Sequence, residues 1–185
     1  DIINPKRKMD YYARCLDHPN IMIRLEGLKI LAKSKDEAAL RHIEKAMKDE
    51  DIQLRLGAYR ALAGRTPERA AKLFVKVMQS DAFGNLEARE RRAVATALGE
   101  TKTDAALAFF DGVFLTKGGL LSRGKTTELK QLAIVGLTAL GTVPAFKVLA
   151  REVQNTKNGK ELMQEAHKAA LRVKAGIQAA RQAHG

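Results

Sequence analysis

One amphipathic pattern of ten residues recurs five times along this chain of 185 residues, with similar residue types in the same order. The five copies are Ile23–Ala32, Leu54–Ala63, Glu90–Gly99, Leu132–Gly141 and a weaker Met163–Arg172. Their aligned leucines are separated by 31, 36, 42 and 31 residues, which is a spacing typical of helical repeats. Because a single repeat of this size cannot bury its apolar face alone, neighbouring repeats must stack on one another.

A second amphipathic stretch precedes each copy, so every repeat predicts a pair of helices. We predict first helices at about 6–17, 37–48, 67–80, 104–116 and 144–155. We predict second helices at about 20–33, 51–63, 86–99, 127–140 and 160–182. No convincing strand pattern is present, and the expected fold is an all-α, right-handed α-solenoid of about five helix pairs.

Helix-boundary residues agree with this division of the chain. Short polar side chains that cap helix N-termini precede three of the predicted helices, at Asp36, Asn85 and Thr103. Glycine inside a helix costs about 1 kcal/mol relative to alanine, so its presence there indicates close packing against a neighbour. We therefore expect close helix contacts at Gly27, Gly57 and Gly136.

The whole chain is expected to form one domain. Its five predicted repeats span about 5–34, 36–65, 67–101, 103–142 and 144–182. The sequence starts without methionine and shows no signal peptide, so we expect a domain excised from a larger protein. The single cysteine, Cys15, fits a reducing compartment and a cytoplasmic location.

The net charge of +12 is the most unusual feature of the composition. Residues 1–92 carry 20 basic and 14 acidic side chains, and residues 93–185 carry 13 and 7, so each half contributes +6. The charge therefore does not come from a basic tail. An evenly distributed positive charge favours anionic partners, either an acidic protein surface or nucleic acid.

Three segments resemble the HEAT repeat, in its bacterial form related to the repeats of phycobilisome lyases. The clearest segment is Lys48–Arg55 followed by Ala58, Ala61 and Leu62. Leu16–Arg24 is similar to the same motif, and Leu137–Ala145 resembles a helix end followed by the start of the next pair. The resemblance covers about 20–180 and implies a stacked array of helix pairs.

The resemblance also implies roles for two sets of basic residues. Arg24, Arg55 and Arg91 would form a structural arginine ladder that pairs with aspartates of the turns between helices, here Asp17, Asp49 or Asp51. The fourth repeat departs from this pattern, with Ala133 at the equivalent position. The second helices would line a concave face, whose candidate partner-binding residues are Lys29, Arg60, Arg92, Lys130 and Lys168.

The most tempting catalytic motif is Gly119–Thr126, which satisfies the GxxxxGK[ST] pattern of a phosphate-binding loop. That chemistry needs a strand before the loop and a helix after it, whereas the preceding segment is predicted to be a helix. We interpret the match as a coincidence within a basic loop that carries Lys117, Arg123 and Lys125.

A non-enzymatic scaffold that binds an acidic protein partner is the function favoured by the sequence. A nucleic-acid-binding array is the main alternative, although aromatic side chains for stacking on bases are few. A HEAT-like DNA glycosylase or a chromophore-lyase-type enzyme is a more distant alternative. We expect no cofactor, no metal site and no transmembrane segment, since neither catalytic clusters, metal-ligand spacings nor long apolar runs are evident.

Overall fold

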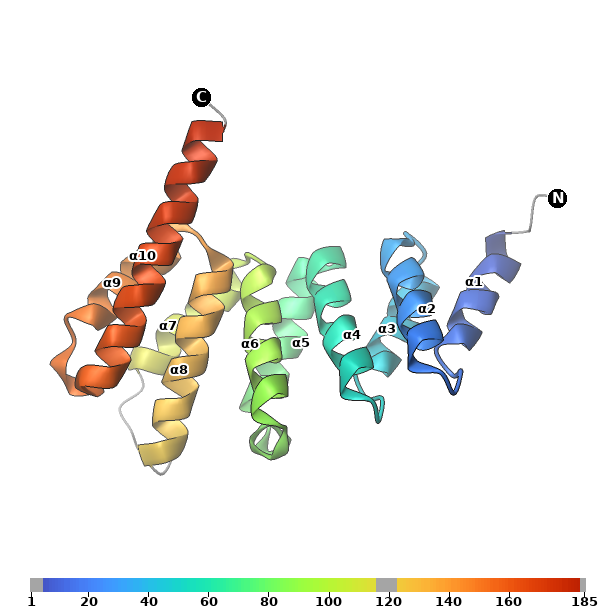
Figure 1. Ribbon diagram of the computed structural model, residues 1–185, viewed down its shortest axis with the longest axis horizontal. Helices are drawn as coiled ribbons and strands as arrows, with labels where there is room; N and C mark the ends of the chain where they lie inside the picture. The colour runs from blue at the N-terminus through green and yellow to red at the C-terminus, as the bar shows by residue number, and fades with distance from the viewer. Residues whose placement is uncertain (1–4, 116–122, 184–185) are drawn as a thin grey trace. The chain divides into compact units, whose positions relative to one another are not determined.

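The computed structural model describes residues 5–115 and 123–183, and within this part every regular element is a helix (Figure 1). The first helices of the predicted pairs are α1 (Pro5–Cys15), α3 (Glu37–Ala46), α5 (Pro67–Gln79), α7 (Asp104–Leu115) and α9 (Val143–Val153). The second helices are α2 (Ile21–Lys33), α4 (Ile52–Arg65), α6 (Ala88–Glu100), α8 (Arg123–Leu140) and α10 (Gly159–Ala183). Short 3-10 helices, Asp81–Asn85 and Thr156–Asn158, precede α6 and α10. The predicted all-α class and the order of the helices are confirmed.

Two of the three predicted N-caps are correct. Asp36 accepts a hydrogen bond from Ala38 N at 2.9 Å, and Thr103 Oγ1 accepts one from Ala106 N at 3.2 Å. The prediction for Asn85 is wrong, because this residue ends the 3-10 helix that precedes α6. Glu87 occupies the N-cap position instead and makes no side-chain capping hydrogen bond.

The predicted loop at 117–126 is wrong for its last residues, since α8 already begins at Arg123. Residues 123–126 read Arg-Gly-Lys-Thr, and only the glycine among them strongly disfavours a helix. Lys117 lies outside the described residues, and so do the side chains of Arg123 and Lys125. Helix α7 precedes the Gly119–Thr126 motif, so the strand that a phosphate-binding loop requires is not present at Asp104–Leu115.

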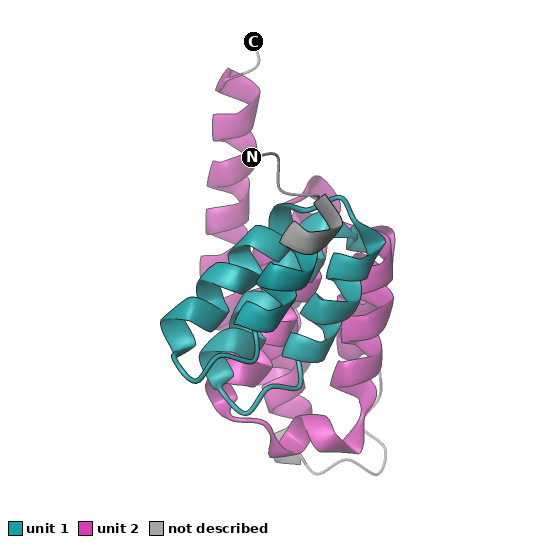
Figure 2. Ribbon diagram, turned by 90° about the vertical axis from the view of Figure 1, so that its right-hand side faces the viewer, with its two compact units in different colours: residues 1–67 teal, residues 68–185 magenta. Residues whose placement is uncertain are grey.

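The chain divides into two compact units, Asp1–Pro67 and Glu68–Gly185, coloured separately in Figure 2. Unit 1 contains α1 to α4 and therefore the first two predicted repeats. Unit 2 contains the other three repeats, with its boundary at the first turn of α5. The expectation of a single domain with five repeats stays a prediction.

In unit 1, α2 packs against α1, α3 and α4, and its buried side chains contribute to the core. Leu31, Ile43 and Leu54 are almost completely buried. The prediction of close contacts at two glycines is confirmed here. A Cβ atom at Gly27 would lie 2.7 Å from Cys15 Cβ, and one at Gly57 would lie 2.8 Å from Leu28 Cδ2.

In unit 2, α8 packs against α6 on one side and α10 on the other, while α7 and α9 also contact it (Figure 1). The close contact predicted at Gly136 is confirmed, since a Cβ atom there would lie 2.0 Å from Phe110 Cζ of α7. Gly99 of α6 faces the same region, and a Cβ atom on it would lie 2.1 Å from the carbonyl oxygen of Gly136. These two glycines therefore allow α6, α7 and α8 to approach closely.

Within the described part of the chain, none of the helices combines the length and the apolar character needed to cross a bilayer.

Candidate functional site

A surface groove of unit 2 runs across its second helices and has a volume of about 810 Å³. It is lined by one face of α6, by α8 and by the first half of α10. Apolar side chains form much of the lining, namely Leu132, Ile134, Val135, Ala139 and Ala169. We call this feature the unit 2 groove.

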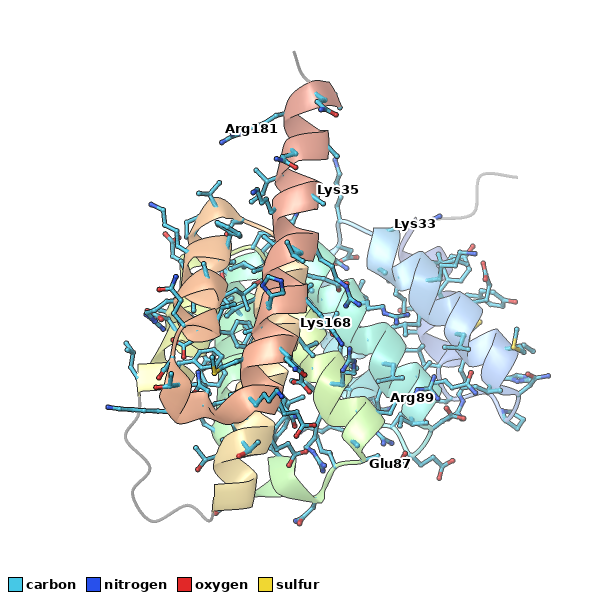
Figure 3. All side chains as sticks on the ribbon, turned by 60° about the vertical axis from the view of Figure 1, so that its left-hand side comes forward. Lys33, Lys35, Glu87, Arg89, Lys168 and Arg181 are labelled. Atoms are coloured by element: carbon cyan, nitrogen blue, oxygen red, sulfur yellow. The ribbon has the colours of Figure 1, made fainter. Side chains whose placement is uncertain are left out.

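Four basic side chains flank the unit 2 groove, two on each side of α8. Arg89 and Arg92 come from α6, and Lys168 and Arg172 come from α10. Figure 3 labels Arg89 at the first turn of α6 and Lys168 on α10. All four side chains are exposed, and none forms a hydrogen bond or ion pair with the residues that the structure describes. Their charges are therefore available to a ligand.

Three carboxylates also line the groove, and two of them already have partners. Glu128 accepts from Arg91 Nη2 at 2.6 Å, and Glu165 accepts from Gln131 Nε2 at 3.1 Å. Glu100 is exposed at the end of α6. The groove is therefore mixed in charge, with a small excess of basic groups.

The hydroxyl groups within the groove are engaged in their own helices. Thr96 Oγ1 donates to the carbonyl of Arg92 at 2.9 Å, and Thr138 Oγ1 donates to the carbonyl of Ile134 at 2.7 Å. With the Gln131 amide bonded to Glu165, these neutral polar groups offer few donors to a bound molecule. Recognition in this groove must rely mainly on apolar contact and on the charged flanks.

Two of the five residues predicted to bind a partner line the same groove. Arg92 and Lys168 lie on opposite sides of the unit 2 groove. Lys29 is exposed and pairs with Glu26 at 3.4 Å, whereas Lys130 Nζ donates to Asn158 Oδ1 at 2.8 Å. Lys29 and Lys130 line neither this groove nor the smaller one of unit 1.

Arg60 lines that smaller groove, which lies within unit 1 and has a volume of about 540 Å³. Its other basic residues are Lys33, Lys35 and Arg65, near the ends of α2 and α4 (Figure 3 labels Lys33 and Lys35). Arg65 is engaged with the carbonyl oxygens of Leu31 and Asp36. Arg65 therefore caps a carbonyl group in the last turn of α2 and also binds the N-cap residue of α3.

Each arginine of the predicted ladder contacts a turn between helices. Arg24 Nη1 lies 2.9 Å from Asp49 Oδ1, and its Nη2 lies 3.6 Å from Asp51 Oδ2. Arg55 donates to the carbonyl oxygens of Asp49 and Glu50 at 2.8 and 2.9 Å.

Arg91 pairs with a glutamate of another second helix, Glu128 of α8, whereas Arg24 pairs with aspartates of a turn. It also donates to the carbonyl oxygens of Gly84 and Leu86, which lie before α6. Asp17, the third candidate partner, pairs instead with Lys45 at 3.1 Å. These contacts support a structural role for the arginine ladder, and this role stays a prediction.

Arg89 and Glu152 were not among the residues predicted from the sequence. Glu152 is buried at 1% exposure and accepts hydrogen bonds from Arg151, Asn155 and Asn158 at 2.7, 3.0 and 2.7 Å. Burial alone would raise the pKa of Glu152, but the hydrogen bonds from Asn158, Arg151 and Asn155 outweigh it and lower that pKa below its ordinary value. The sequence signal for this hydrogen-bond network was the presence of two asparagines, Asn155 and Asn158, shortly after Glu152.

No cluster of three or more potential metal-ligating side chains occurs among the described residues. No curated protein is similar in sequence to this chain. HEAT repeats in general act as scaffolds for protein–protein interaction and are typically not enzymes. A family model described as HEAT repeats matches residues 12–90, from the middle of α1 to the start of α6. The resemblance inferred from the sequence is thus confirmed over this segment, and residues 12–90 are similar to HEAT repeats.

Proposed function

We propose that this protein is a non-enzymatic scaffold whose unit 2 groove binds a segment of a partner protein with acidic character. The observation that carries this proposal is the set of four exposed basic side chains without partners among the described residues, two on either side of an apolar floor. Apolar burial provides most of the binding free energy in such surfaces, and complementary charge provides specificity and fast association.

Nucleic acid fits the unit 2 groove less well. A phosphate backbone requires a continuous basic track, but Glu100, Glu128 and Glu165 interrupt the basic residues here. The lining residues also include no aromatic side chain on which a base could stack. An acidic protein segment can place carboxylates beside the cations and apolar side chains on the floor.

A peptide selection tests this function. Random displayed peptides of about 20 residues, long enough to cross the groove in a helical or extended form, would be selected on the wild-type protein. We expect the selected peptides to be enriched in Asp and Glu and to lose binding to the double variant R92E/K168E. The matched control is K72E/K147E, which changes the net charge equally at two exposed lysines of α5 and α9.

The proposal is wrong if the selected peptides have no acidic bias, or if R92E/K168E binds them as well as K72E/K147E does. Fluorescence anisotropy with labelled duplex and single-stranded DNA over a salt series is the parallel measurement. Tight DNA binding at physiological salt that R92E/K168E abolishes would favour the nucleic-acid alternative, since phosphate contacts give a steep dependence on salt.

A further inference from the structure

Three close contacts fix how the second helices of unit 2 align along their axes. Each charged residue beside the groove can therefore be assigned a height, meaning its position along the axis of α8. Arg91 of α6 lies level with Glu128 of α8, and Gly99 lies level with Gly136. Gln131 of α8 lies level with Glu165 of α10. A residue of α6 therefore aligns with the α8 residue 37 positions later, and a residue of α10 aligns with the α8 residue 34 positions earlier.

This alignment places the basic groups at two different heights. Arg89 and Arg92 on α6 lie beside positions 126–129 of α8, whereas Lys168 and Arg172 on α10 lie beside positions 134–138. The offset between the two basic pairs is about 13 Å along the helix axes, at 1.5 Å per residue. The basic groups therefore lie on a diagonal across α8.

Two of the three carboxylates, Glu100 and Glu165, lie on the opposite diagonal, whereas Glu128 lies on α8 near the height of Arg92 and pairs with Arg91. Glu165 on α10 is level with Gln131, near the height of Arg92 on the other flank. Glu100 on α6 is level with position 137, near the height of Arg172. A bound segment that runs along the basic diagonal thus avoids both carboxylates. One that runs along the other diagonal meets them at both ends, which would repel acidic residues.

The floor favours a helix over an extended segment. An extended chain needs hydrogen-bond partners for its backbone, which a sheet edge normally supplies, and the described residues form no strand. The side chains of Thr96, Thr138 and Gln131 are already engaged within the protein. A helix satisfies its own backbone groups and needs only apolar contact from the floor.

We propose that the partner segment is an amphipathic helix with an acidic cluster at each end, lying diagonally across α8. Neighbouring helix axes lie about 8–10 Å apart, so α6 and α10 are separated by about 18 Å across α8. Together with the axial offset, the two basic pairs lie about 22 Å apart, which corresponds to about 15 residues of helix. This inference rests on the proposed function and specifies the secondary structure and the charge pattern of the partner.

Three synthetic peptides of about 18 residues test the inference by fluorescence anisotropy; this length adds one residue or two beyond each acidic cluster. The first has glutamates at both ends and an apolar face between them. The second has the same composition with its glutamates gathered at the centre, and the third is the first with a central proline that breaks the helix. We expect the second and third to bind about tenfold or more weakly than the first, because they lose charge pairs or helical structure.

Charge reversal on one flank supplies an independent measurement. We expect R89E/R92E to weaken binding of the first peptide about tenfold, and a peptide with lysines in place of glutamates at one end to recover that loss. K72E/K147E is the control and should leave binding of all peptides unchanged.

The inference is overturned if the centrally acidic peptide or the proline peptide binds as tightly as the first while binding still requires Arg92 and Lys168. In that case the acidic-partner function survives and only the diagonal helix fails. If the peptides bind but R92E/K168E has no effect, or if no acidic peptide binds, the proposed function fails together with the inference.

Discussion

Replacing Gly99 by alanine should destabilise unit 2, although alanine is the better helix former. A Cβ atom at this position would lie 2.1 Å from the carbonyl oxygen of Gly136 and 2.9 Å from Ala139 Cβ. Both distances are below ordinary van der Waals contact, and the closer atom belongs to the backbone of α8. Relief of the clash therefore requires α6 and α8 to separate by about 1 Å, because a backbone atom cannot rotate aside as a side chain does.

The magnitude follows from two opposing effects. Overpacking of a well-packed interface costs about 3 kcal/mol at the upper end of its usual range. The higher helix propensity of alanine returns about 1 kcal/mol. The expected net loss is about 2 kcal/mol, which would lower the urea midpoint of unfolding by about 1 M for a slope near 2 kcal/mol per M.

Gly176→Ala is the matched control, because Gly176 is an exposed residue of α10 and a Cβ atom added to it would meet no other atom within 4 Å. It should leave stability unchanged or raise it by up to about 1 kcal/mol. Urea unfolding followed by circular dichroism at the helical band measures both variants. A Gly99→Ala protein as stable as wild type would refute the close approach of α6 and α8.

Two further predictions concern buried or partly buried charge. Arg24→Ala should lower the free energy of unfolding by about 1–3 kcal/mol, because it leaves Asp49 and Asp51 without their guanidinium partner. Lys29→Ala breaks an exposed pair and should change the free energy of unfolding by less than about 1 kcal/mol. Equal effects of the two variants in urea unfolding would argue against a structural ladder. The folded protein lowers the pKa of Glu152, so its carboxylate stabilises the fold above about pH 4.3, the ordinary glutamate value, and this contribution is lost as the pH falls through the folded pKa. Glu152→Gln should therefore be less stable than wild type at pH 7 and should lose less stability between pH 5 and about pH 3, as measured by thermal unfolding over a pH series; an unchanged pH profile would contradict the hydrogen-bond network.

Local features of the sequence were enough to predict the helices and their pairing. The period of the apolar residues identifies each helix, and caps such as Asp36 and Thr103 act through hydrogen bonds to residues two or three positions away. The boundary of α8 was harder to predict, because a glycine-containing basic segment reads as a loop when only local propensity is considered.

The sequence by itself determined the all-α repeat architecture and the positions where helices approach closely, since both depend on short-range periodicity and on residue size. The tertiary structure decided which basic residues face a common groove, because that depends on the alignment of helices far apart in the chain. Lys130 and Arg92 were both predicted from the sequence to bind a partner. In the structure Lys130 donates a hydrogen bond to Asn158, whereas Arg92 flanks the groove opposite Lys168. The contacts of Arg91 with Glu128 and of Gln131 with Glu165 fix that alignment, and each joins residues more than 30 positions apart.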